Sequence, residues 1–261
     1  MTETDPTAPQ TAPIAVVTGA ARGLGRALAT ELCARGVCVA GIGRSATSLA
    51  PVTEALAEHT FLPVVADMAD PDAVAAAFRE VDAAFGPVEI LINNAAVYPH
   101  RDILEETPGS FMDTLAINLG GPVAANHEAL KRMVKTGQGR IITVTSYAGR
   151  RPAPMSAAYS VSKEAARALH RALHADLGDR FPGIILTDWI PGALNTEMGI
   201  SNGLDPARVA RWGAELALSR DRSLNGAIFD ENREDLPPQS FKRRLFEKVT
   251  GRARRPRVLP G

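Results

Sequence analysis

Short apolar runs alternate with helical patterns along most of the chain. The apolar runs have the length of strands and lie at residues 14–17, 37–42, 61–66, 88–92, 140–144 and 184–186, with a weaker run at 227–229. Helical patterns follow the first run as far as residue 35, and then cover residues 46–58, 71–85, 108–135 and 156–178. Strands that are apolar throughout and separated by helices are typical of a parallel sheet covered on both faces, so the pattern predicts an α/β fold.

The rules for connecting parallel strands narrow this prediction to one architecture. Right-handed crossovers give a doubly wound sheet of the Rossmann type flanked by helices. No repeat or linker interrupts the pattern, so we expect a single domain over residues 13–238. Residues 1–12 are polar and rich in Pro and Thr, which indicates a flexible tail and not a signal peptide. Residues 239–261 are expected to form a C-terminal helix and a basic tail.

Composition agrees with one globular domain. The chain has 261 residues, 45% of them hydrophobic, and a formal net charge of zero. No apolar run approaches the roughly 18 residues that span a membrane. Two cysteines, Cys33 and Cys38, are too few for a disulfide framework or a metal site, so we expect a cytoplasmic protein without a metal.

Positive charge is concentrated near the C-terminus, where residues 241–257 contain eight Lys or Arg and one acid. A solvated helix face followed by a loose tail explains this run better than binding to nucleic acid or to an anionic membrane. Neither interleaved aromatic residues nor a nucleic-acid reader motif accompanies it.

A glycine-rich turn, Thr18-Gly19-Ala20-Ala21-Arg22-Gly23-Leu24-Gly25, follows the first predicted strand. Glycines permit a tight turn there and let backbone N–H groups approach a diphosphate at a helix N-terminus. The spacing is G-x-x-x-G-x-G and not the commoner G-x-G-x-x-G. A sharp turn alone would also use glycine, but the position after an N-terminal strand favours a nucleotide site.

The end of the second predicted strand bears on the choice of cofactor. An acid there would hold the ribose hydroxyls of NAD, whereas a basic residue accommodates a 2′-phosphate. This chain has Gly43-Arg44-Ser45 and a second arginine, Arg22, in the turn, which favours NADP over NAD. The alternative is that Arg22 only caps or solvates the turn.

Tyr159 and Lys163 stand four residues apart on a predicted helix, and Ser146 precedes Tyr159 by thirteen residues. This spacing places the phenol and the ammonium on one face of the helix. A neighbouring cation favours the phenolate, so we expect a lowered Tyr159 pKa and a usable acid or base. Alone, such a spacing arises by chance in most chains.

With the glycine turn and Asn93-Asn94-Ala95-Ala96 after the fourth strand, these residues resemble the short-chain dehydrogenase/reductase family of the classical type over residues 13–230. The resemblance implies that Tyr159 protonates a carbonyl oxygen as hydride arrives from a nicotinamide and that Ser146 bonds the same oxygen. It implies that Lys163 binds the nicotinamide ribose and lowers the tyrosine pKa, and that Asn118 supports a water in the proton relay.

The resemblance also implies a set of cofactor contacts. Asp67 is similar to the residue that binds the adenine amine, and Thr196 to the threonine that holds the carboxamide. The full set is Gly19, Arg22, Gly23, Leu24, Gly25, Arg44, Asp67, Asn94, Ala95, Tyr159, Lys163, Pro191, Gly192 and Thr196. Taken singly, several of these residues also have a purely structural interpretation: Ser146 as a strand-end hydroxyl, Asp67 as a helix cap, Asn118 bonded to backbone, and Thr196 in a turn.

The chain departs from the family pattern in two places. Ala96 replaces the usual glycine, so we expect an ordinary backbone there. Residues 225–232 differ from the usual Val-Asp-Gly-Gly-like end and are closer to the retinol-dehydrogenase-like and carbonyl-reductase-like branch, which puts the common tetramer in doubt. A homo-oligomer is still expected, with dimer and tetramer both open.

The expected substrate contacts are Tyr98, Pro99, and Trp189 or Met198, unless Trp189 is a core residue, and His100 is a candidate for the substrate mouth. Residues 196–211 are short for a substrate lid, which leaves either an open site for a bulky ketone or a compact one.

Taken together, the sequence predicts an NADP(H)-dependent oxidoreductase that reduces a small ketone or aldehyde, or oxidises the corresponding alcohol. We expect neither nucleic acid nor membrane as a partner. The Ala-, Arg- and Pro-rich composition favours a bacterial source of high GC content, where such enzymes often tailor secondary metabolites. The alternative is a catalytically silent NADP(H)-binding sensor or scaffold protein, although such proteins typically lose the tyrosine or the lysine.

Overall fold

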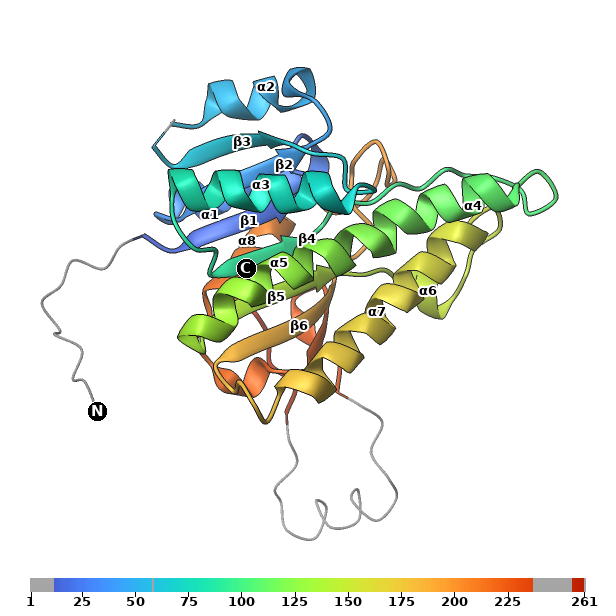
Figure 1. Cartoon of the computed structure of the whole chain (residues 1–261). Coiled ribbons are helices and arrows are strands. Elements are labelled where there is room, and N and C mark those ends of the chain that lie inside the picture. Colours follow the sequence, from blue (N-terminus) through green and yellow to red (C-terminus); the bar gives the residue numbers. More distant parts are fainter. Residues whose placement is uncertain (1–11, 58, 237–254, 261) are drawn as a thin grey trace, which may run out of the picture.

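The apolar runs of the sequence form one sheet in the computed structural model, which describes residues 12–57, 59–236 and 255–260. The strand order is β3-β2-β1-β4-β5-β6-β7-β8, and only the β7–β8 pair is antiparallel within these residues (Figure 1). The predicted doubly wound α/β fold is confirmed. The strands are β1 (Ile14–Thr18), β2 (Cys38–Gly43), β3 (Phe61–Val65), β4 (Ile90–Asn93), β5 (Gly139–Val144), β6 (Ile184–Ile190), β7 (Ala227–Asp230) and β8 (Arg233–Glu234).

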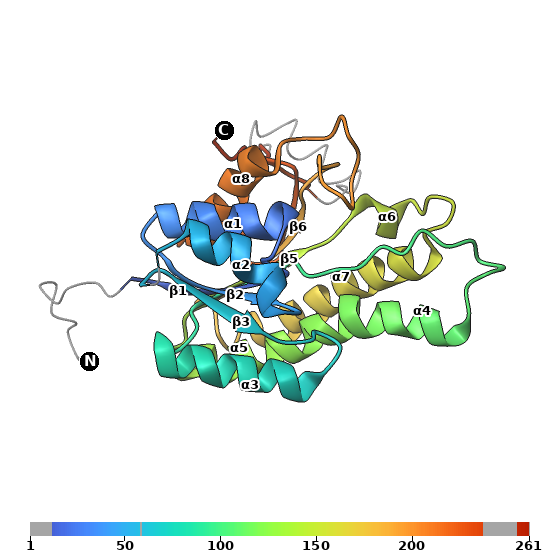
Figure 2. The same cartoon turned by 90° about the horizontal axis from the view of Figure 1, so that it is seen from above.

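Helices cover both faces of this sheet (Figure 2). They are α1 (Gly23–Ala34), α2 (Ala46–Ala55), α3 (Pro71–Ala84), α4 (Pro108–Leu115), α5 (Gly121–Thr136), α6 (Tyr147–Arg150), α7 (Ala157–Leu177) and α8 (Pro206–Leu218). A π-helical turn, Ala116–Gly120, joins α4 to α5, so the single helix predicted over 108–135 is interrupted. Pro122 explains the interruption, because proline has no N–H to continue the α-helical hydrogen bonds.

Side chains of the central strands alternate between two cores. On β1, Ala15 and Val17 pack with α1 and α8, whereas Ile14 and Val16 pack on the opposite face with α3 and α5. Because every strand in the middle of the sheet is buried on both faces, its sequence is a continuous apolar run and not an alternating one.

Helix α8 was not predicted from the sequence, where residues 196–211 were described only as short for a substrate lid. Asp205 caps the helix by accepting a hydrogen bond from the Ala207 N–H (3.0 Å), and Pro206 occupies its first turn, as is common at helix starts. At Gly213 an added Cβ would lie 2.5 Å from Leu28 and 2.8 Å from Trp189. Trp189 is fully buried, so it belongs to the core, which was the alternative given for it.

The C-terminal edge of the sheet contains more structure than the sequence predicted. The weak run at 227–229 does form β7, and β8 pairs with it. The Leu259 N–H donates to the Asn232 carbonyl oxygen (2.7 Å), and Val258 bridges Arg233. Residues 255–260 therefore lie along β8 and are not a loose tail. The predicted C-terminal helix and most of the N-terminal tail lie outside the described residues. Among the described helices, none has the length and apolar character needed to cross a membrane.

His170 on α7 gives the fold a predicted sensitivity to acid. It is 3% exposed, its Nε2 has no hydrogen-bond partner among the described residues, and burial lowers its pKa from 6.5 to about 4. Between these two values the unfolded chain binds a proton that the folded chain does not bind, so stability is lost as the pH falls from 6.5 to about 4. The loss from this residue should be about 3 kcal/mol.

We therefore expect His170→Met to be less sensitive to acid than the wild type in urea unfolding measured at pH values across this range. His127→Gln, at an exposed position on α5, is the matched control and should keep the wild-type pH dependence. Equal losses on acidification for His170→Met and wild type would contradict this account.

Candidate active site

The turn between β1 and α1 can be built only with glycine at three positions. Gly19 and Gly23 have φ values of +69° and +53°. At Gly25 an added Cβ would lie 2.1 Å from the Gly19 carbonyl oxygen. The residue before α1, Arg22, makes no side-chain cap, so no capping side chain competes with a ligand for the first N–H groups of α1. This cradle fits an anionic group such as a diphosphate.

A hydrogen-bonded junction connects this turn to the end of β4. The Thr18 hydroxyl accepts hydrogen bonds from the N–H groups of Asn94 and Ala95 (3.0 Å each) and donates to the Ile92 carbonyl oxygen (3.4 Å). The Asn94 Nδ2 donates to the Thr18 carbonyl oxygen (2.9 Å). No role is predicted for Thr18 from the sequence, where the one signal is a hydroxyl residue at the end of an apolar strand.

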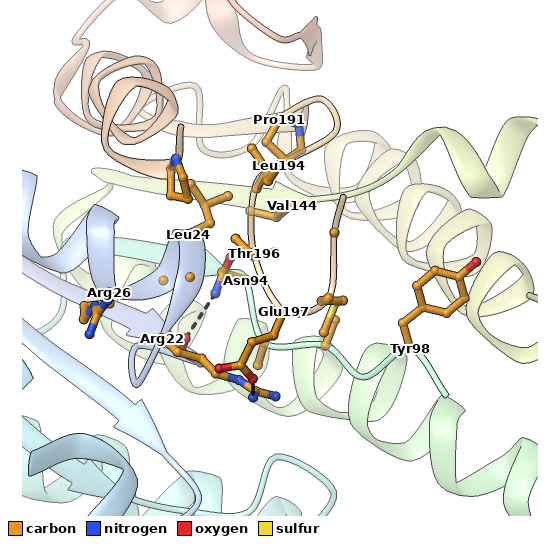
Figure 3. A pocket seen from close by; sticks show the side chains of 18 of the residues that line it. Arg22, Leu24, Arg26, Asn94, Tyr98, Val144, Pro191, Leu194, Thr196 and Glu197 are labelled. Carbon is orange, nitrogen blue, oxygen red and sulfur yellow. Dashed lines mark hydrogen bonds and ion pairs between the residues drawn. The ribbon is translucent and has the colours of Figure 1, made fainter. Parts of the chain in front are cut away.

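A cavity of about 1400 Å³ runs along the carboxyl ends of the strands. Parallel strands gather these ends at one edge, where ligands of such sheets bind. Figure 3 shows how side chains from α1, from the segment after β4 and from the segment after β6 surround it. Every predicted catalytic or cofactor-binding residue lines this cavity except Asn118. The structure thus brings the predicted set together, although their roles stay predictions.

The two arginines expected to favour NADP both line the cavity, and both are exposed. Arg44 directly follows β2. Arg22 forms an ion pair with Glu197 from the segment after β6 (Figure 3). Glu197 was not among the predicted site residues, because nothing in its local sequence indicates the long-range pair.

Ser146 and Tyr159 come from different elements and meet in the cavity. The Ser146 Oγ accepts from the Ala148 N–H at the start of α6 (3.2 Å), and Tyr159 lies in the first turn of α7. The Tyr159 ring stacks on Tyr98, with centroids 4.3 Å apart. Burial raises the pKa of the Tyr159 phenol, the hydrogen bond with Ser146 lowers it in part, and Tyr98 raises it.

Lys163 is buried beneath this pair. Its Nζ donates to the Val144 carbonyl oxygen (2.9 Å) and lies 5.8 Å from the centroid of the Tyr159 ring. Burial lowers the Lys163 pKa to about 8, and the Asp188 carboxylate offsets this in part. The expected lowering of the Tyr159 pKa by Lys163 is wrong for the chain by itself. The ammonium is directed to a backbone carbonyl, and burial of the phenol dominates.

Asn118 lies in the π-helical turn between α4 and α5, and its side chain bonds backbone, which was the structural alternative given for it. Its Oδ1 accepts from the Val97 N–H (2.8 Å), and its Nδ2 donates to the Val97 carbonyl oxygen (2.9 Å) and to the Ser162 hydroxyl (3.0 Å). The side-chain amide therefore holds the segment that carries Tyr98, and the support of a relay water by Asn118 stays a prediction.

The part of the cavity lined by the segment after β4 is aromatic. Tyr98 packs on His100, with ring centroids 3.9 Å apart, and both line the cavity together with Met198. Pro99 does not line it. Ala96 has an ordinary negative φ, as expected.

A family model described as short chain dehydrogenase matches residues 13–206. The chain belongs to the short-chain dehydrogenase family. The predicted resemblance is therefore confirmed, and this family comprises oxidoreductases that use NAD(P) and act on CH–OH and C=O groups.

Three relatives illustrate the range of the family. Dehydrogenase/reductase SDR family member 7B of Bos taurus is 32% identical over 72% of this chain and 60% of its own length. The 3-oxoacyl-(acyl-carrier-protein) reductase FabG of Escherichia coli (strain K12) is 29% identical over 71% of this chain and 75% of its own length. The 2-dehydro-3-deoxy-L-rhamnonate dehydrogenase (NAD(+)) of Sphingomonas sp. (strain SKA58) is 34% identical over 79% of this chain and 81% of its own length. The chain spans 55% to 60% of the length of its mammalian relatives.

The junction at Thr18 predicts a specific loss of stability. Thr18→Val keeps the shape of the side chain but leaves the Asn94 and Ala95 N–H groups without their acceptor, which should cost about 1–3 kcal/mol in urea unfolding. Thr18→Ser retains the hydroxyl and should recover most of the loss. Equal stability of the valine variant and wild type would show that the junction is unimportant.

Proposed function

We propose that this chain is an NADP(H)-dependent oxidoreductase that reduces a ketone or aldehyde on a small molecule, or oxidises the corresponding alcohol. The observation that carries the proposal is the meeting of Ser146, Tyr159 and Lys163 in the cavity that begins at the glycine turn. Membership of the short-chain dehydrogenase family supports it.

The residues of the site fit the needs of carbonyl reduction. The nicotinamide, when bound, supplies the hydride. Negative charge then develops on the carbonyl oxygen and must be met by fixed donors. The Ser146 and Tyr159 hydroxyls both line the cavity and are hydrogen-bonded to each other, so they can act as two such donors. Since burial raises the Tyr159 pKa, the phenol is protonated at neutral pH and is ready to give its proton to that oxygen.

The glycine turn and the N-terminus of α1 would hold the diphosphate of the cofactor. Arg44 and Arg22 would bind a 2′-phosphate, because no acid stands at the end of β2 to hold free ribose hydroxyls. Arg22 would exchange its exposed pair with Glu197 for the phosphate. The free thiols of Cys33 and Cys38 support a reducing, cytoplasmic setting.

Substitution of the phenol tests the proposed reaction. Tyr159→Phe keeps the stacked ring and removes the proton donor, so carbonyl reduction should fall by about 10²- to 10⁴-fold. NADPH binding, followed by fluorescence titration, should persist. Near-normal turnover by the variant over a panel of ketones and aldehydes would exclude this mechanism. NADPH binding to the wild type without oxidation by any carbonyl would favour the sensor protein instead.

Substitution of Arg44 tests the choice of cofactor. Arg44→Ser removes a charged donor from a phosphate, which should raise the KM for NADPH by about 10- to 100-fold, since such a bond is worth roughly 1.5–3 kcal/mol. The KM for NADH in the same variant is the control and should change little. A wild-type preference for NADH, or equal losses with both cofactors, would contradict the assignment of NADP(H).

A further inference from the structure

A buried carboxylate, Asp188, interrupts the apolar run of β6 directly behind the candidate active site. Its side chain is 2% exposed and does not line the cavity. A carboxylate costs several kcal/mol to bury unless it is paired and hydrogen-bonded. An aspartate in an otherwise apolar central strand therefore needs partners, and the partners identify its role.

One oxygen of Asp188 contacts the end of β5. The Thr145 hydroxyl donates a hydrogen bond to Oδ1, and the Thr145 N–H bonds the carbonyl oxygen of Trp189 on β6 (2.8 Å). Thr145 lies between Val144, whose carbonyl oxygen accepts from Lys163, and Ser146. Asp188 therefore holds the segment that contains Ser146 and the Val144 carbonyl oxygen, which is the partner of Lys163.

The other oxygen contacts α7. Oδ2 lies 3.2 Å from the Nε of Arg167, which is 5% exposed. Arg167 is one turn beyond Lys163, and Lys163 is one turn beyond Tyr159, so all three occupy neighbouring positions on the helix. Asp188 therefore connects the segment after β5, which carries Ser146, to the helix that carries Tyr159 and Lys163.

The charges around Asp188 are mostly positive. Lys163 and Arg167 of α7 are buried cations, Arg150 of α6 is a further cation that acts on Asp188, and Glu164 is a partly exposed acid on α7. The Asp188 carboxylate is the group that opposes the effect of burial on the Lys163 ammonium. Its negative charge favours the protonated form of its cationic neighbours.

We propose that Asp188 is a positioning residue for the reaction: through Thr145 and Arg167 it fixes the distance between Ser146 and Tyr159, and it places a negative charge near the buried Lys163 ammonium. This inference rests on the proposed function, but its electrostatic part can be measured without turnover.

The electrostatic part is tested with Asp188→Asn, which keeps the size of the side chain and an oxygen to accept from Thr145. NMR titration of protein labelled with ¹³C-lysine, with Lys163→Met to assign the signal, reports the Lys163 pKa directly. We expect this pKa to fall below its wild-type value. The alkaline limb of the pH–kcat profile should move to lower pH with it.

Glu128→Gln is the matched control, because Glu128 is another buried acid with cationic partners, Lys131 and Arg132 on α5, and does not line the cavity. It should lose stability, as a broken buried pair does, and leave both the Lys163 titration and the pH profile unchanged. Thermal unfolding of both variants separates the effect on stability from the effect on the site.

The positioning part is tested with Thr145→Val, which keeps the charge of Asp188 and removes its hydrogen bond. We expect kcat to fall by about 10-fold or more with a smaller change in KM, because misplaced catalytic groups slow the reaction. Thr145→Ser should restore kcat. This variant keeps the positioning part testable even if Asp188→Asn does not fold.

An unchanged Lys163 pKa in folded Asp188→Asn would overturn the electrostatic role, even with high turnover. A lowered pKa would support it, even if no carbonyl substrate is reduced and the proposed function fails. Wild-type kcat in Thr145→Val would overturn the positioning role.

Discussion

The hydrogen bond from the buried Lys163 ammonium to the Val144 carbonyl oxygen sets the position of α7 against the end of β5. A buried cation needs a hydrogen-bond partner, and the Val144 carbonyl oxygen at the end of β5 provides it. Once this bond is made, Tyr159 lies one turn away on the helix, and Ser146 lies two residues further along the chain. The hydroxyl and the phenol then come close enough to share a hydrogen bond, and the stacking of Tyr98 on the Tyr159 ring adds to this placement. The chemistry of the site thus depends on where one ammonium is buried.

The other end of the cavity depends on a neutral junction. Thr18 and Asn94 join the carboxyl ends of β1 and β4 through backbone and side-chain hydrogen bonds. Strand order in the sheet passes from β2 through β1 to β4, so this is the point where the connections diverge to the two sides. A crevice opens at such a point because the helices that follow leave in opposite directions. The backbone of the glycine turn lies in this crevice, and the first N–H groups of α1 are available to a ligand in the cavity.

Burial acts in opposite directions on the two titratable groups of the site. It raises the pKa of Tyr159 and lowers that of Lys163, since both uncharged forms are favoured away from water. The phenol is therefore held as a proton donor, which suits the reduction of a carbonyl. Asn118 serves this arrangement indirectly, because its amide holds Val97 and so the segment that places Tyr98 on the Tyr159 ring.

The sequence by itself determined the fold class, six strands and a seventh weaker one, and the residues that gather around the cavity. Apolar runs, glycine spacing and the tyrosine–lysine spacing are local patterns, and a parallel sheet brings its strand ends together whatever the details. Only the tertiary structure decided what each side chain meets. In the folded protein the Asn118 amide binds the Val97 backbone, and Trp189 is buried under α8. Arg22 pairs with Glu197, and the Tyr159 pKa is raised where a lowered value was expected. These outcomes depend on burial and on partners as many as 175 residues apart along the chain. Spacing along the sequence carries no information about either.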